Sequence, residues 1–135
     1  MTKLPEEWED KECREAYMEA AINYGLAWQI RTNRQKRKMR REDLYKRIKS
    51  INGKSCPIAI LEDPDVWEKR LKYLKVLAKA FDCALLVKFV PYSKLAEEWE
   101  DLSDKAMFAA PYSKERAEQA LQRMADNAKE LGLDY

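Results

Sequence analysis

The sequence predicts a mostly helical chain that contains a single β-strand. Only 3 Gly and 5 Pro occur among the 135 residues, and these are too few turn-forming residues for a β-sandwich. Apolar residues recur every three or four positions through most of the chain, which is the period of an amphipathic helix. A short run of β-branched and apolar residues at positions 84–90 is typical of a strand instead. The length favours one domain with an additional element.

The N-terminal part combines an acidic segment with helical spacing. Its periodic residues are Cys13, Ala16, Tyr17, Ala20 and Tyr24. They predict a helix over residues 11–23. Gly25 then weakens the pattern. A second helix is expected to run to about residue 38 with Leu26, Ala27 and Ile30 on its buried side. One long helix with a kink at Gly25 would show the same pattern.

A pair of short helices joined by a turn is expected next. The first covers residues 41–48, where Leu44 and Ile48 lie one turn apart and form its buried side. Residues 49–54 follow as a turn. The Asn-Gly pair at positions 52–53 favours this turn because both residue types adopt positive φ at little cost.

The second helix of the pair is expected over residues 55–62. Ser55 is a suitable N-cap, and Pro57 is tolerated in the first turn because its missing N–H would have no partner there. This helix must stop before the Asp-Pro pair at 63–64. A longer helix over residues 65–81 has the strongest periodicity of the chain. Its apolar residues are Trp67, Leu71, Leu74, Ala78 and Phe81.

The helical period then ends, and residues 84–90 predict the strand, which Pro91 terminates. A lone strand leaves its backbone N–H and C=O groups without partners. The same strand of a second subunit is the simplest partner, and Leu85, Val87 and Phe89 would then be dimer-interface residues. A buried extended tail that lies across the helices is the alternative.

Two more helices are expected, over residues 93–102 and 113–131. Each begins in the tetrapeptide Pro-Tyr-Ser-Lys, whose serine can cap the helix. The second has one apolar face and ends at Gly132, a suitable stop. That face consists of Ala117, Ala120, Leu121, Met124, Ala128 and Leu131. The segment Glu-Glu-Trp-Glu-Asp also occurs twice, at 6–10 and 97–101, and we interpret it as a recurrent acidic helix start.

Charge is strongly segregated along a chain whose net charge is only +2. From Arg31 to Lys54 there are eleven basic and two acidic residues, whereas the remainder contains 15 basic and 22 acidic residues. A cationic segment of this density favours a polyanion-binding surface, because each phosphate contact releases condensed counterions. A basic face that is merely solvated is the alternative.

Four segments resemble a known family of DNA-binding proteins. They are residues 25–31 (GLAWQIR), 61–64 (LEDP), 74–82 (LKVLAKAFD) and 84–95 (ALLVKFVPYSKL). Over this part the chain is similar to the Cro and phage-repressor-like (XRE-type) helix-turn-helix regulators. The resemblance implies a five-helix lambda-repressor-like domain, followed by the strand and the C-terminal helices. It also implies a cytoplasmic, homodimeric transcription regulator of prophage repressor or antitoxin type, with double-stranded DNA as its partner.

The chain departs from this family where DNA would be read. Arg40 and Arg41 stand where the family has Ser or Thr and a phosphate-contacting Gln, and arginine can still bind phosphate. The turn between the two short helices is longer than in the family. Ser55 stands in place of a base-reading Gln, and residues 56–60 offer few donors for base recognition. Selectivity would then come from the long turn or from DNA shape.

These observations define the candidate site residues and domains. The expected DNA-binding residues are Arg31, Arg34, Lys36, Arg37, Lys38, Arg40, Arg41, Lys46, Arg47, Lys49, Asn52, Lys54 and Ser55. The expected domains are an acidic segment and helix (1–24), the helix-turn-helix domain (25–82), a dimerisation strand (83–92) and a C-terminal helical extension (93–135). The interpretation requires that the arginines of the basic segment face outward on one side and are not neutralised by internal carboxylates.

Composition disfavours the other function classes. The chain has no His, which excludes catalytic pairs and zinc sites that use imidazole. Its 3 Cys form no CxxC pair, and no Gly-rich phosphate loop or membrane-length apolar run is present. We therefore expect no enzyme activity, cofactor, metal or membrane partner. Besides an operator-binding regulator, the remaining possibility is a helix-turn-helix protein whose apolar residues 57–60 dock a toxin or a phage or host factor.

Overall fold

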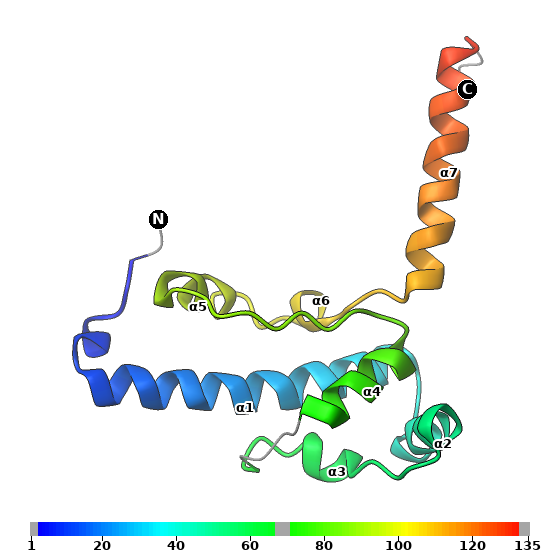
Figure 1. Cartoon of the computed structure of the whole chain (residues 1–135). Coiled ribbons are helices and arrows are strands. Elements are labelled where there is room, and N and C mark those ends of the chain that lie inside the picture. The colour runs from blue at the N-terminus through cyan, green and yellow to red at the C-terminus, as the bar shows by residue number, and fades with distance from the viewer. Residues whose placement is uncertain (1–2, 67–70, 133–135) are drawn as a thin grey trace.

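A computed structural model describes residues 3–66 and 71–132 of the chain and is mostly helical (Figure 1). The predicted helical class is thus confirmed. The elements are η1 (Glu6–Glu9), α1 (Lys11–Lys36), α2 (Arg41–Asn52), α3 (Ile58–Leu61), α4 (Leu71–Phe81), α5 (Tyr92–Glu98), α6 (Asp104–Met107) and α7 (Tyr112–Glu130). The expected residue Trp67 lies outside the described residues.

Helix α1 is one continuous helix and resolves the alternative that the sequence left open at Gly25. It begins at the N-cap Asp10, whose side chain accepts a hydrogen bond from the backbone N–H of Glu12, and continues for 26 residues. The expected end at residue 23 is therefore wrong. A mid-helix Gly costs only about 1 kcal/mol relative to Ala, and α1 packs against other elements on both sides of Gly25. Trp99 approaches this glycine from α5.

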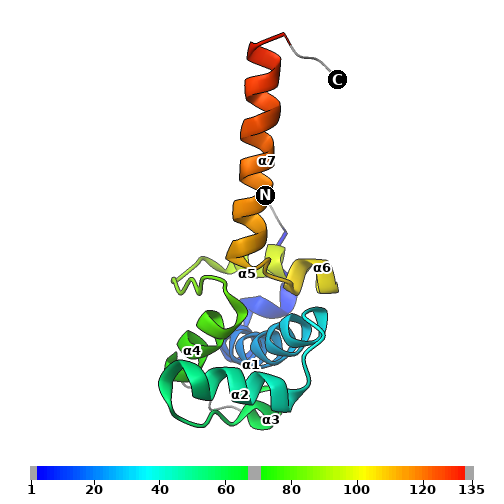
Figure 2. The same ribbon diagram turned by 90° about the vertical axis from the view of Figure 1, so that its right-hand side faces the viewer.

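The core of the molecule lies between the C-terminal half of α1 and helices α2, α3 and α4, which cluster together in Figure 2. Leu44 and Ile48 of α2 are completely buried, as their spacing predicted. Leu61 of α3 and Leu77 of α4 close the core from the other side. Helix α2 continues to Asn52, so the expected helix end at residue 48 and the expected turn over residues 49–54 are wrong. The helix stops at the C-cap Gly53, which has φ 71°, so of the expected Asn-Gly turn only the positive φ at the glycine is found.

Helix α3 is shorter than the expected helix over residues 55–62. It begins only at Ile58, and Pro57 occupies its N-cap position without a capping side chain. The prediction that Ser55 caps this helix is therefore wrong. The chain reaches α3 through Cys56, whose side chain is buried in the core. The path of residues 54–57 is therefore set by the burial of Cys56 and not by helix capping.

The buried thiol of Cys56 supplies a first testable prediction. Burial raises its pKa to about 11, so the thiol stays protonated near pH 8, and the thiolate is the form that reacts. We expect Cys56 to resist alkylation by iodoacetamide in the folded protein and to react rapidly in urea, as measured by peptide mass spectrometry. Fast modification of Cys56 without denaturant would contradict its burial.

The described residues contain no β-strand, so the strand predicted over residues 84–90 is wrong. This segment is extended and makes no backbone–backbone hydrogen bond with the described residues. The alternative of a buried tail also fails, because Leu86, Val87 and Phe89 are exposed, Phe89 completely at 107%. The sequence has strand propensity here, but a single chain offers no neighbouring strand edge that could complete a ladder.

Aromatic contacts attach η1 and α5 to the N-terminal half of α1. Trp8 of η1 is buried, with its ring centroid 4.9 Å from that of Tyr17 and 5.5 Å from that of Tyr92. Trp99, which follows α5, lies 6.1 Å from Tyr17 and 6.2 Å from Trp28. The two Glu-Glu-Trp-Glu-Asp segments thus place their tryptophans against the same tyrosine, which gives this repeat a packing role.

Helix α7 projects from the body on the side opposite to α2 and α3 in both views (Figures 1 and 2). Its N-terminus is attached to Asp82 at the end of α4. The backbone N–H of Tyr112 donates to the Asp82 carbonyl at 2.6 Å, and that of Ser113 donates to the Asp82 carboxylate at 3.0 Å. The expected serine caps are wrong, since Pro91 and Pro111 occupy the N-cap positions of α5 and α7.

Candidate nucleic-acid interface

The eleven cationic residues from Arg31 to Lys54 divide into two groups. Arg34 and Arg37 are partly buried, whereas the other nine are exposed. Exposure decides which of them can contact a phosphate, because a cation that already fills internal hydrogen bonds has no donors to offer. The structure therefore does not bring all the expected DNA-binding residues to one surface.

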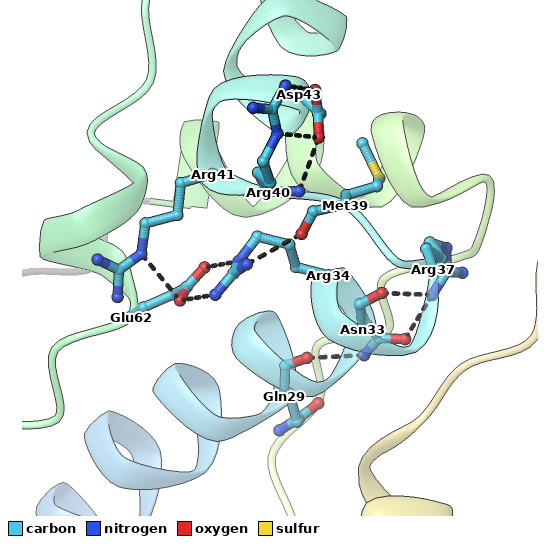
Figure 3. Close-up of polar contacts among 9 residues, drawn as sticks. All are labelled: Gln29, Asn33, Arg34, Arg37, Met39, Arg40, Arg41, Asp43 and Glu62. Carbon is cyan, nitrogen blue, oxygen red and sulfur yellow. Dashed lines mark hydrogen bonds and ion pairs between the residues drawn. The ribbon is translucent and has the colours of Figure 1, made fainter.

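Arg34 forms an internal ion pair with Glu62, the residue that ends α3. Its Nε donates to Glu62 Oε2 at 2.7 Å and its Nη2 to Oε1 at 3.0 Å, a bidentate arrangement (Figure 3). Its Nη1 donates to the carbonyl of Met39 at 2.9 Å. The Glu62 side chain is completely buried, and the hydrogen bond to it raises the pKa of Arg34. Arg34 therefore joins α1 to α3 and has no free donor pair for DNA.

Arg37 joins three parts of the chain. Its guanidinium donates to the carbonyls of Phe81 at 2.6 Å and Ala109 at 2.7 Å, and to the Asn33 side chain at 3.0 Å. It lies 5.0 and 5.3 Å from the ring centroids of Phe81 and Phe108, and burial lowers its pKa. Arg37 thus fastens the end of α4 and the segment before α7 to α1.

Asn33 completes this junction, and the sequence analysis did not single it out. Its side-chain amide donates to the carbonyls of Gln29 and Met107, and its Oδ1 accepts from the backbone N–H of Ala109 at 2.9 Å. Asn33 is buried. Its spacing of four residues from Arg37 places both on one face of α1, but only the tertiary structure shows what they hold.

Three of the remaining arginines of the segment keep exposed side chains but have partners of their own. Arg40 donates to the Asp43 carboxylate from its backbone and side chain, and this contact lowers the pKa of Asp43 (Figure 3). Arg41 reaches Glu62 at 3.3 Å yet stays about half exposed. Arg47 donates to the carbonyl of Ala80. The requirement therefore fails for Arg34 and Arg37, which serve the interior. Arg41 is exposed but pairs with the internal carboxylate of Glu62, so it meets the requirement only in part.

One stripe of exposed residues runs along α2. It consists of Arg41, Tyr45, Lys49 and Asn52, whose spacing of three and four residues places them on one side of the helix. Arg41 contacts Glu62 at the end of α3, so the stripe begins beside α3. Tyr45 was not among the expected site residues, although its position four residues after Arg41 could have indicated it.

The stripe continues into the turn that leads to α3. The side-chain oxygen of Asn52 accepts a hydrogen bond from the backbone N–H of Lys54 at 2.9 Å. The side chains of Lys54 and Ser55 are both exposed. The exposed residues of α3 itself are Ala59 and Ile60. Neither has a side-chain hydrogen-bond donor, so α3 offers no bidentate contact to a base edge.

The cations of the basic segment, including Lys49 of the stripe, differ in whether they already have an anionic partner. Lys36 is 3.5 Å from Asp104 of α6, and Lys46 is 3.4 Å from Glu42, both in exposed pairs of small energetic value. Arg31, Lys38 and Lys49 are exposed and form no ion pair with the described residues. They are therefore available to an external anion.

The described residues also form a small cavity away from the stripe on α2. A cavity of about 90 Å³ lies between α1, α4 and residues 83–85 and 107–109, and its lining is mostly apolar. No group of three or more Cys, Asp or Glu that could hold a metal ion occurs within 3–66 and 71–132. None of the helices described is both long and apolar enough to cross a membrane.

Comparison with known proteins adds no relative. The chain matches no family model, no curated protein and no solved structure.

Proposed function

We propose that this protein is a DNA-binding transcription regulator of the phage, prophage or antitoxin type, which binds duplex DNA as a homodimer through α2, α3 and the turn between them. The exposed cationic stripe on α2, from Arg41 to Asn52, is the observation that carries the proposal. Helices α2 and α3 are both anchored in the buried core through Leu44, Ile48 and Leu61. A rigid helix pair with an exposed basic side suits the groove and backbone of duplex DNA.

Within this proposal the phosphates supply most of the affinity. Arg41 and Lys49 would contact the backbone, with Lys54 at the end of the stripe. Selectivity would come from Asn52, Ser55 and the turn, or from the deformability of the duplex, because the exposed residues of α3 are apolar. The resemblance to XRE-type regulators noted in the sequence supports the same function.

The salt dependence of duplex binding tests the proposal. Wild-type protein should bind a labelled random-sequence duplex, with log K falling against log[salt] by roughly 0.9 per phosphate contact. Lys49→Glu should weaken binding about tenfold and reduce the slope by about one. The matched control is Lys129→Glu on α7, which makes the same charge change at an exposed residue far from α2 and should leave both quantities unchanged. Fluorescence anisotropy measures both. Equal effects of the two variants would contradict the proposal.

A second function is favoured by the apolar character of the same surface. Ile60 of α3 is 51% exposed, and Ile51 near the end of α2 is also exposed. Of the apolar segment 57–60, Ala59 and Ile60 are exposed and Ile58 is buried, and an exposed apolar patch that included these two residues would suit a protein-docking surface. The chain would then be a helix-turn-helix protein that docks a toxin or a phage or host factor. Absence of duplex binding at low salt would favour this second function over the first.

A further inference from the structure

Helix α7 exposes an apolar face that no described part of the chain covers. All its residues from Tyr112 to Glu130 are exposed except Ala128, and Leu121 and Met124 are each 66% exposed. Leu131, directly after the helix, is 74% exposed. A helix that leaves the body of a protein derives its stability mainly from packing of such a face, so α7 needs a partner.

The spacing on this face has a specific geometry. The apolar residues Ala117, Leu121, Met124, Ala128 and Leu131 are separated by four, three, four and three residues. This is the heptad spacing of a coiled coil, in which the residues of the seam fill holes in a second helix. The seam begins at Ala117, since the preceding position of the pattern is Lys114. A single flat docking groove would not require this alternation.

The residues beside the seam indicate which helix is the partner. Ala120, Ala125 and Asn127 are uncharged, and Glu118 is the only charged residue at these flanking positions. If two copies of α7 lie parallel and in register, Glu118 faces Ser113, and Ala120 faces Ala125, so no like charges meet. Apart from Glu118 and from Lys114, which occupies the seam position before Ala117, the charged residues of α7 lie away from the seam. They are Glu115, Arg116, Arg123, Asp126, Lys129 and Glu130. The seam is therefore compatible with a second copy of itself.

The base of α7 favours the parallel arrangement. Asp82, directly after α4, binds the N-terminus of α7 and forms a corner with it. The exposed apolar residues Leu86, Val87 and Phe89 follow this corner in the chain. A parallel pair brings the two Asp82 corners, and the start of the exposed apolar segment that follows each of them, to the same end of the dimer. An antiparallel pair would separate the corners by the length of α7, roughly 28 Å at 1.5 Å per residue.

We propose that two copies of this chain dimerise through α7 as a short parallel coiled coil. The proposal rests on the homodimer of the proposed function and assigns it an interface. Because α7 projects away from α2 and α3, dimerisation leaves both α2 stripes free. Two such helix pairs held by one stalk can contact successive half-sites of one duplex.

Oligomeric mass without DNA tests the interface. In sedimentation equilibrium the full-length wild-type chain should be a dimer. Leu121→Glu should raise the dimer dissociation constant by about 100-fold or more, because it puts a charge in the seam. Gln119→Glu is the matched control, since it adds the same charge to the outer side of α7, and it should remain dimeric. A wild-type monomer, or a Leu121→Glu dimer as tight as the control, overturns the proposal.

Cross-linking tests the parallel register. Leu121→Cys should give a disulfide-linked dimer on mild oxidation, whereas Asp126→Cys, on the outer side, should give no more than the wild type with its native Cys13, Cys56 and Cys83. Failure of Leu121→Cys to cross-link overturns the parallel arrangement. The result is separable from the proposed function. A dimer that binds no duplex refutes only DNA binding. A monomer that binds duplexes with the expected salt dependence refutes the homodimer and its α7 interface but leaves DNA binding in place.

Discussion

Replacement of Glu62 by Gln is expected to lower the free energy of unfolding by about 3 kcal/mol. The Glu62 carboxylate is completely buried and accepts hydrogen bonds from Arg34 and Arg41. Gln keeps the shape of the side chain but removes its charge and turns an acceptor into a donor that faces a guanidinium. The Arg34 side chain, only 12% exposed, would then be a buried charge without its counter-charge, which is the costly half of a broken internal ion pair.

Urea unfolding followed by circular dichroism measures this effect, with an unchanged m-value as evidence that the folded state stays compact. Glu42→Gln is the control. Glu42 also contacts two cations, Arg40 and Lys46, but in exposed pairs, so the change should cost less than about 0.5 kcal/mol. If Glu62→Gln lowers the free energy of unfolding no more than Glu42→Gln does, the ion pair of Arg34 with Glu62 does not join α1 to α3.

Replacement of Arg37 by Met should cost about 2–3 kcal/mol and loosen the chain before α7. Met keeps the aliphatic stem between Phe81 and Phe108 but loses the donors to Asn33, Ala109 and the Phe81 carbonyl. The carbonyls of Phe81 and Ala109 lie in two separate segments, and the Arg37 guanidinium binds both. Without this donor, the segment before α7 should no longer be held against α1. If Arg37 were a phosphate contact, the same change would instead reduce the salt slope of duplex binding.

Limited proteolysis and duplex binding together separate these two roles. Arg37→Met should increase cleavage within residues 105–111 and leave the salt slope unchanged. Arg31→Met is the control on the same helix, because Arg31 is exposed, and its effect on stability should stay below about 0.5 kcal/mol. Unaltered stability together with a reduced slope for Arg37→Met would restore Arg37 to the DNA surface.

The helices of the core were predictable because the signals that form them are local. Leu44 and Ile48 are one turn apart in α2, and Gly53, which stops this helix, has a backbone preference for positive φ of its own. The end of α2 was predicted four residues too early, because residues 49–52 continue the helix up to this glycine. Helix α3 was predicted with the wrong start. Its first turn is decided by the burial of Cys56 among residues distant in sequence, and capping propensity cannot report such burial.

The strand predicted over residues 84–90 and the predicted DNA-binding residues show what the sequence could not reveal. Residues 84–90 have the composition of a strand, but a strand exists only when a second strand completes its hydrogen bonds, and none does so in the described chain. For the cations, the density of charge was visible in the sequence, while the direction of each side chain was not. Arg37 and Lys38 are adjacent in sequence, and one is enclosed by two phenylalanines while the other is exposed.

The sequence by itself determined the helical class, the positive φ of Gly53, the buried side of α2 and the concentration of positive charge between Arg31 and Lys54. Each of these depends on residues within a few positions of one another. Only the tertiary structure decided that Arg34 and Arg37 serve the interior, that α2 presents its own stripe, and that α7 stands uncovered. These outcomes depend on partners such as Glu62 and Ala109, which are remote in sequence and are brought near only when the core packs.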